Sequence, residues 1–261
     1  MHVDVVDLRG FYSGPLGTVA RRLIARQLRT RWPNVAGQTV IGLGYATPFL
    51  STFASDALRI GALMPAPQGV IHWPQDGPFR TVLVDDDALP LPDGSVDRLL
   101  MAHALEMSQQ PQYLLREAWR VLSPGGRLIA VVPNRRGMWA RIDTTPFGFG
   151  RPYSRTQLTS LMRDAMFNPS GWVTALSMPP FNLRFLIRSA TALERLGSWL
   201  TPAFAGVLIV EATKQVYAPV AVQRRERQVA RGLRPVLLPP AAGATRVMPV
   251  SAETPPGLQP D

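Results

Sequence analysis

Short apolar segments alternate with helical segments from residue 39 to residue 132, and no other feature of the sequence constrains the fold as strongly. The last of them, Arg127–Val132, is almost wholly apolar after its first residue. Strands of this kind are typical of a parallel sheet that helices cover on both sides. The segments that we expect to be strands are Thr39–Leu43, Arg59–Met64, Arg80–Val84, Asp97–Ala102 and Arg127–Val132.

Apolar residues at helical spacing predict the helices of the chain. Gly17–Trp32 is amphipathic, with Arg21, Arg22, Arg26 and Arg29 mostly on its polar side. This basic face fits a solvated surface, and it also fits contact with an acidic partner or a membrane surface. Further helices are expected at Phe49–Leu58, Pro111–Leu122, Arg155–Met166 and Ser189–Trp199, and two final strands at Trp172–Met178 and Gly206–Thr213.

These elements divide the chain into three parts. We expect residues 1–36 to form a helical segment packed on the domain, and residues 37–218 to form the α/β domain itself. Within the domain, residues 134–166 are expected to form a lid and substrate region. Residues 219–261 are rich in Pro, Ala and Arg with little periodicity, which predicts a disordered tail.

The totals exclude several classes of site. The chain has no cysteine, so disulfides, thiolate metal ligands and a cysteine nucleophile are absent. The apolar run Ala205–Val210 is far shorter than the roughly 20 residues that cross a bilayer. With no recognisable secretory signal, we expect a cytoplasmic protein without a transmembrane segment, and peripheral membrane contact stays open.

The formal net charge of +10 raises the question of nucleic acid, because clustered Arg and Lys neutralise phosphates. Lys214 is the only lysine, and a bias toward Arg with abundant Ala, Gly and Pro is also typical of a GC-rich genome. No nucleic-acid-binding motif accompanies the charge. Nucleic acid therefore ranks last among the partners that we consider.

Two stretches in the middle of the chain resemble the same protein family. Residues 85–97 read DDDALPLPDGSVD, and residues 110–128 read QPQYLLREAWRVLSPGGRL. At this separation they resemble the corresponding segments of class I S-adenosylmethionine-dependent methyltransferases, and the likeness covers about residues 40–166. The resemblance implies a Rossmann-like, mostly parallel seven-stranded sheet with helices on both faces and the last strand antiparallel. It also implies S-adenosylmethionine as the cofactor.

The first loop, residues 40–48, departs from the family pattern of an acid followed by Gly-x-Gly-x-Gly. Gly42 stands at the acid position, Gly44 is retained, and Ala46 and Pro48 replace the other two glycines. Gly44 can still take a positive φ and let the backbone approach a ligand. The carboxylate that helps position the methionine end of the cofactor in the family is missing. The cofactor contacts that the resemblance implies in this loop are Gly42, Gly44, Tyr45 and Ala46.

The loops after the next strands keep only part of the family pattern. The second strand is followed by no acid, and Gln68 is either a ribose ligand or a solvated loop residue. Asp85 matches the family residue that hydrogen-bonds the adenine amino group, with the Asp86 backbone beside it, and Ala102 lies where the fourth strand passes the cofactor. Three adjacent carboxylates without further ligands at suitable spacing favour a solvated loop, and no metal is expected.

Two side chains are candidates for catalysis. His103 follows the fourth strand, where an imidazole suits either a general base or a residue that caps the strand end. Tyr153 in the lid is the second candidate, whereas Glu106 fits a helix or ion-pair residue better than a catalyst. Methyl transfer from a sulfonium depends mainly on positioning, so a weak base signature does not argue against an enzyme.

The lid combines arginines and aromatic rings with glycines that would permit movement. Such a surface suits an anionic acceptor with an aromatic or lipid-like portion, and it equally suits an ordinary cover with solvated arginines. The substrate candidates are Arg135, Arg136, Trp139, Arg151 and Tyr153.

Three functions follow from these observations. The first is S-adenosylmethionine-dependent methyl transfer to a small-molecule or lipid-like acceptor, preferably anionic. The alternative is a methyltransferase-like binding or regulatory protein whose missing acids reflect reduced catalysis. A nucleic-acid methyltransferase is the third.

Overall fold

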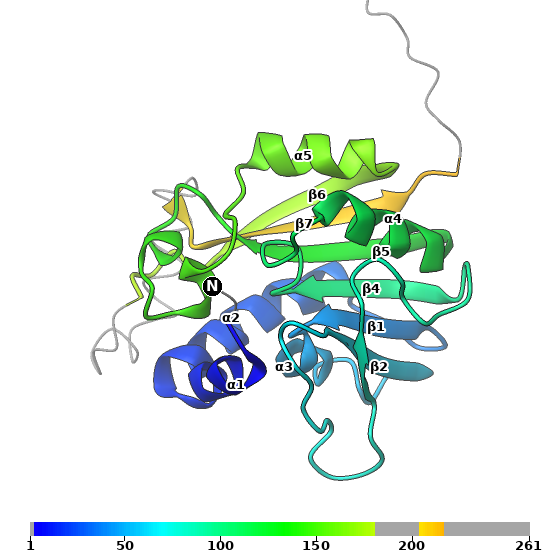
Figure 1. Cartoon of the computed structure of the whole chain (residues 1–261), viewed down its shortest axis with the longest axis horizontal. Helices are drawn as coiled ribbons and strands as arrows, with labels where there is room; N and C mark the ends of the chain where they lie inside the picture. Colours follow the sequence, from blue (N-terminus) through cyan, green and yellow to red (C-terminus); the bar gives the residue numbers. More distant parts are fainter. Residues whose placement is uncertain (1–2, 181–203, 217–261) are drawn as a thin grey trace, which may run out of the picture. The chain divides into compact units, whose positions relative to one another are not determined.

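Seven strands form one sheet within the residues that the computed structural model describes, which are 3–180 and 204–216. Their order is β3-β2-β1-β4-β5-β7-β6 (Figure 1). Neighbours from β3 to β5 are parallel, whereas β7 runs antiparallel to both β5 and β6, as predicted. The strands are β1 (Thr39–Gly44), β2 (Arg59–Pro65), β3 (Thr81–Val84), β4 (Val96–Ala102), β5 (Leu122–Pro133), β6 (Phe167–Ala175) and β7 (Val207–Lys214).

The strand order reverses between β1 and β4, which are neighbours in the sheet although β2 and β3 separate them in the chain. Ligands of open α/β sheets bind outside the carboxyl ends of the strands at such a reversal. The loops after β1 and β4 therefore mark the position of the site.

Helices cover both faces of the sheet, as predicted (Figure 1). Buried residues of β4 alternate between the two faces, since Leu100 belongs to the core beneath α1 and α2 and Leu99 to the core beneath α4 and α5. The first layer contains α1 (Val5–Ser13), α2 (Pro15–Arg31) and α3 (Thr47–Leu50), and the second contains α4 (Pro111–Val121) and α5 (Arg155–Asp164).

Helix α1 lies within residues 1–36, where a helical segment was expected, although the apolar spacing located only the helix at Gly17–Trp32; α1 supplies part of the site. Asp4 caps its N-terminus by accepting hydrogen bonds from the backbone of Val6 and Asp7, at 2.7 and 2.9 Å. An aspartate in front of an apolar run is a helix-start signal that the sequence carries. The following helix was predicted at Gly17–Trp32 and is confirmed as α2.

Two predicted boundaries were wrong. The helix expected at Phe49–Leu58 ends at Leu50, because the backbone then makes tight turns in which the amides of Thr52 and Phe53 bond carbonyls three residues back. The strand expected at Trp172–Met178 runs from Phe167 to Ala175 and accommodates Pro169 at an irregularity in the pairing. The helix expected at 189–199 and the tail from 219 lie outside the described residues.

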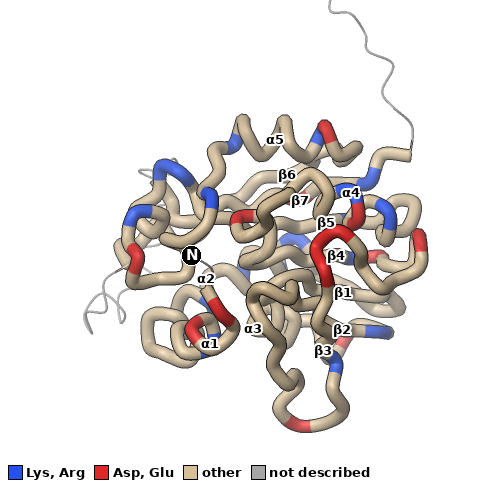
Figure 2. The backbone as a smooth tube through the Cα atoms, in the orientation of Figure 1, with Lys and Arg blue, Asp and Glu red and all other residues tan. Residues whose placement is uncertain are grey.

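The positions of the charged residues and the hydropathy of the helices bear on the nucleic-acid and membrane questions that the composition raised. Arg and Lys are spread over the lid, α4, α5 and the sheet ends, with Asp and Glu among them (Figure 2). Within residues 3–180 and 204–216, every helix is too short or too polar to cross a membrane.

Candidate active site

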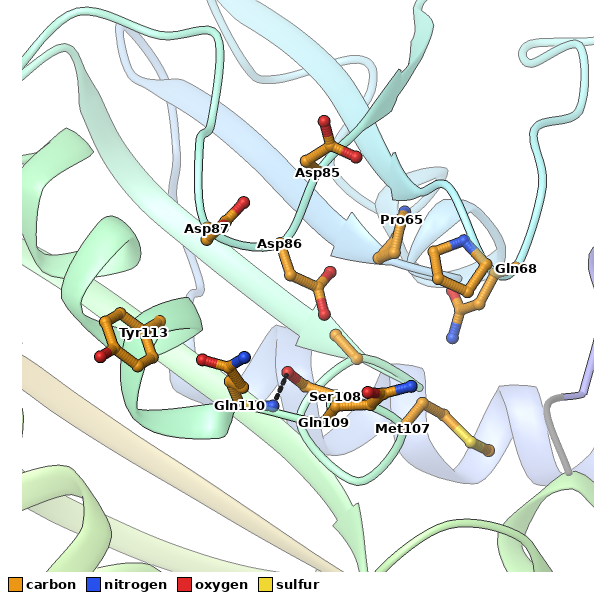
Figure 3. A pocket seen from close by; sticks show the side chains of 12 residues that line it. Pro65, Gln68, Asp85, Asp86, Asp87, Met107, Ser108, Gln109, Gln110 and Tyr113 are labelled. Atoms are coloured by element: carbon orange, nitrogen blue, oxygen red, sulfur yellow. Dashed lines mark hydrogen bonds between the residues drawn. The ribbon is translucent and has the colours of Figure 1, made fainter.

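A pocket of about 520 Å³ opens at the carboxyl ends of β2, β3 and β4 (Figure 3). Asp85 and Asp86 from the loop after β3 and Gln68 from the loop after β2 line it. The opposite wall was not predicted and comes from the segment between β4 and α4. That wall contains Ala104, Met107, Ser108, Gln109, Gln110 and Tyr113.

The acidic loop differs from the expectation in one respect. The side chain of Asp86 points toward Ser108 and Gln110, whereas that of Asp85 points away from them (Figure 3). Asp85 is also exposed, whereas Asp86 is half-buried. The structure therefore brings both predicted acids to the pocket, with the carboxylate of Asp86 facing its opposite wall.

Helix α4 holds this loop in place. The carboxylate of Glu117 accepts a hydrogen bond from the backbone amide of Leu89 at 2.9 Å. The guanidinium of Arg120 donates hydrogen bonds to the carbonyl oxygens of Leu89 and Leu91, each at 2.8 Å. Arg120 also pairs with Glu117 at 2.7 Å and with Asp93 at 2.6 Å. The hydrogen bond from Arg120 holds the pKa of Glu117 below its ordinary value. The two stretches that carry the family resemblance thus form one clamp.

The first loop is packed tightly against its neighbours. A side chain at Gly42 would place its Cβ 2.6 Å from Cδ1 of Leu50 and 2.7 Å from Cβ of Ala46. Gly44 has φ +81, as expected, but its Cα faces the carbonyl oxygen of Ala102, where a Cβ would overlap it. The place of the missing family carboxylate is therefore filled by α3, and the close approach at Gly44 is to β4.

Tyr45 and Ala46 follow in the same turn and are buried. Tyr45 stacks on Tyr12 of α1, with ring centroids 5.8 Å apart and an interplanar angle of 21°. The 520 Å³ pocket is lined from the loops after β2, β3 and β4. None of Gly42, Gly44, Tyr45 and Ala46 lines it. The structure thus separates the predicted cofactor residues into two groups.

His103 lies between these groups with its backbone in the left-handed region, at φ 52. Its Nε2 lies 2.7 Å from the hydroxyl of Tyr12, and its Nδ1 lies 3.3 Å from Oε1 of Glu106. Both His103 and Glu106 are 1% exposed. Burial, followed by the charge of Glu106, raises the pKa of Tyr12 well above its ordinary value, so that Tyr12 is protonated at neutral pH.

Gln68 is neither solvated nor free to turn. It is buried, and its amide nitrogen donates to the backbone carbonyl of His103. The backbone carbonyl of Gln68 accepts a hydrogen bond from the amide of Val5 at 2.8 Å, which joins the start of α1 to the loop after β2. The side-chain oxygen Oε1 of Gln68 is buried without a hydrogen-bond partner among the described residues.

A second pocket, of about 510 Å³, is lined by Pro111 and Gln112 at the start of α4 and by residues of the segment after β5. Arg135, Arg151 and Tyr153 line it together with Gln157. Within the described part of the chain, neither arginine has an ion-pair partner. The backbone of Arg151 is fixed by a hydrogen bond of 2.8 Å that its amide donates to the backbone carbonyl of Glu106.

The other two predicted substrate residues lie elsewhere. Trp139 is 1% exposed, donates to the carbonyl of Met178 at 2.7 Å and packs edge-on against Phe147. Arg136 is exposed and lines neither of the two pockets. Trp139 is therefore a core residue of segment 134–166, because its indole nitrogen finds a backbone partner inside the protein.

No group of three or more His, Asp or Glu residues that could hold a metal occurs among residues 3–180 and 204–216. The three adjacent aspartates after β3 lack further ligands nearby. The arrangement supports binding and positioning chemistry.

Comparisons with known proteins agree with this geometry. Residues 40–130 match a family described as "Methyltransferase domain". A SAM-dependent methyltransferase of Thermotoga maritima, described as a possible histamine N-methyltransferase, has a TM-score of 0.57 and 18% identity over 81% of this chain and 96% of its own. No curated protein sequence matches the chain.

Other structures show the range of the fold. Geranyl diphosphate C-methyltransferase of Streptomyces coelicolor, whose structure contains S-adenosyl-L-homocysteine, has a TM-score of 0.51 and 17% identity over 73% of this chain and 78% of its own. The [4+2]-cyclase SpnF has a TM-score of 0.51 and 20% identity over 76% of this chain and 82% of its own.

The sheet order and the antiparallel β7 define a Rossmann-like methyltransferase fold. The match of residues 40–130 to the methyltransferase domain family, together with this fold, supports a class I S-adenosylmethionine-dependent methyltransferase with S-adenosylmethionine as its cofactor.

Proposed function

We propose that the protein transfers a methyl group to an anionic small-molecule or lipid-like acceptor that binds in the 510 Å³ pocket. The observation that carries the proposal is that Arg135 and Arg151 both line this pocket, together with Tyr153. Two guanidinium groups without acidic partners favour a carboxylate or phosphate. The apolar side chains of Pro111, Pro152 and Leu161 in the same pocket suit a hydrocarbon portion.

The 520 Å³ pocket fits the adenosine part of the cofactor. The unpartnered oxygen of Gln68 is available to a ribose hydroxyl. Asp85, with the Asp86 backbone beside it, lines the pocket where the adenine amino group would bind. When bound, the cofactor supplies an electrophilic methyl group on a sulfonium. Met107–Gln110 line the 520 Å³ pocket and Pro111 lines the 510 Å³ pocket, so consecutive residues of one segment reach both.

Tyr153 serves this proposal as a hydrogen-bond donor. Burial raises its pKa to about 12, with the charge of Glu106 adding to the increase and that of Arg151 opposing it. A phenol with this pKa is protonated at neutral pH and does not act as a base. An acceptor whose nucleophile is already anionic needs no base, which agrees with the protonation of Tyr153.

We assign His103 a positioning role. Its two ring nitrogens face Tyr12 and Glu106, and its carbonyl accepts from Gln68. These contacts join α1, the loop after β2 and the end of β4 around one residue. They favour the structural alternative for His103 over a general base, because neither nitrogen faces one of the two pockets.

The experiment is transfer of a labelled methyl group from S-adenosylmethionine to matched acceptors: aromatic carboxylates, fatty acids, the corresponding neutral alcohols and single-stranded RNA. We expect transfer to carboxylates only. The double variant R135Q/R151Q should raise KM for a carboxylate at least about tenfold with little change in kcat, whereas R136Q should not.

Equal transfer to the neutral alcohols, or equal KM values in R135Q/R151Q and R136Q, would show that charge at this pocket does not select the acceptor. Binding of S-adenosylhomocysteine without transfer to any compound would favour the binding-protein alternative.

A further inference from the structure

A third pocket, of about 340 Å³, lies between the N-terminal helices and the loop after β2. Arg9 and Tyr12 of α1 form one side of it and Arg21 of α2 another. Tyr45 lines it from the turn after β1, and Trp73 lines it from the loop between β2 and β3. It shares no lining residue with the 520 Å³ or the 510 Å³ pocket.

The charge of this pocket has one sign. Arg9 and Arg21 have no ion-pair partner within the described residues, and no Asp or Glu is among the side chains that line it there. Two other arginines of α2, Arg29 and Arg31, differ, since Arg29 pairs with Asp56 and Arg31 lies 3.9 Å from Glu211. Two unpaired guanidinium groups at one hollow provide donors for an anion.

Aromatic rings form the inner part. Tyr45 and Tyr12 are stacked and buried, and Trp73 is half-buried. Burial raises the pKa of Tyr45 to about 12, and the charge of Arg9 acts in the opposite direction, which places Arg9 within electrostatic reach of this ring. Aromatic walls below a charged rim suit a flat ligand with a charged end.

We propose that this pocket binds a small aromatic anion, a planar ring that carries a carboxylate or a phosphate group. The ring lies among Tyr12, Tyr45 and Trp73, and the anionic group contacts Arg9 and Arg21. The site is separate from that of the cofactor, because the hydrogen bonds Tyr12–His103 and Val5–Gln68 lie between the third pocket and the 520 Å³ pocket.

Calorimetric titration of the full chain with phenyl phosphate and with benzoate tests the proposal. Inorganic phosphate and phenol serve as half-ligands, and each should bind at least about tenfold more weakly than the compound that combines both parts. R9Q/R21Q should weaken binding of the aromatic anions at least about tenfold. The matched control is R22Q/R26Q, which removes the same charge from exposed positions of α2 outside the pocket.

Preferential binding of phenyl phosphate over benzoate would assign a phosphate group to the ligand, and the reverse order would assign a carboxylate. Equal losses in R9Q/R21Q and R22Q/R26Q would overturn the proposal, because diffuse charge would then explain the binding. So would undetectable binding of both aromatic anions. Saturating S-adenosylhomocysteine should leave the affinity unchanged within about threefold; competition between the two would place the pocket within the cofactor site and overturn its separate role.

Discussion

The hydroxyl of Tyr12 lies 2.7 Å from Nε2 of His103, although the two residues are 91 positions apart in the sequence. This contact joins helix α1 to the end of β4, beside the point where the strand order reverses. It makes the N-terminal segment a part of the site.

Tyr12→Phe tests the strength of this junction. The change leaves Nε2 of His103 buried without its partner, and we expect the free energy of unfolding to fall by about 1–3 kcal/mol. Urea denaturation measures it. Tyr113→Phe is the control, since Tyr113 is exposed and its change should stay within about 0.5 kcal/mol. Equal stability of Y12F and the parent would mean that the contact does not hold α1 in solution.

Gly42→Asp restores the acid of the family pattern without restoring its function. The new Cβ would meet Leu50 and Ala46, and the carboxylate would be buried, so the variant should lose about 1–3 kcal/mol of stability. The double change G42D/L50A removes the nearest obstacle and should recover part of this loss. Thermal unfolding and binding of S-adenosylhomocysteine measure both effects. Tighter binding by a fully stable G42D would contradict the packing described here.

Asp85→Ala and Asp86→Ala test the acidic wall of the 520 Å³ pocket. We expect each to weaken binding of S-adenosylhomocysteine at least about tenfold without changing the unfolding midpoint, because both residues line the pocket and neither is fully buried. Asp164→Asn, an exposed acid at the end of α5, is the control. Calorimetry on protein stripped of bound ligand gives the affinities. Unchanged binding in both alanine variants would place the adenosine elsewhere.

The lowered pKa of Glu117 predicts that the free energy of unfolding depends on pH. Its pKa is lowered in the folded protein, chiefly by the hydrogen bond from Arg120. The unfolded chain therefore binds the proton more readily, and the stabilisation is fully present above the ordinary glutamate pKa of about 4.3 and is lost as pH falls through the lower folded value. Glu117→Gln should flatten this acid limb of the unfolding free energy. An identical pH profile in E117Q would show that the clamp contributes nothing through ionisation.

The strands and the main helices could be predicted because their signals are local. An apolar segment such as Arg127–Val132 has one stable place, the middle of a sheet covered on both sides, and the contacts of Arg120 explain why residues 85–97 and 110–128 occur together. The helix after β1 was predicted too long, since the spacing of Phe49 to Leu58 does not reveal that the backbone turns at Ser51.

The sequence by itself determined the class of fold, most of its strands and the acids that line the 520 Å³ pocket, because these follow from periodicity and from motifs within one stretch of chain. Only the tertiary structure decided that Leu50 fills the place opposite Gly42, that Gln68 and Tyr12 meet at His103, and that Trp139 belongs to the core. Those relationships join residues far apart in the chain. They depend on which side chains fill the same space, and no local pattern encodes that.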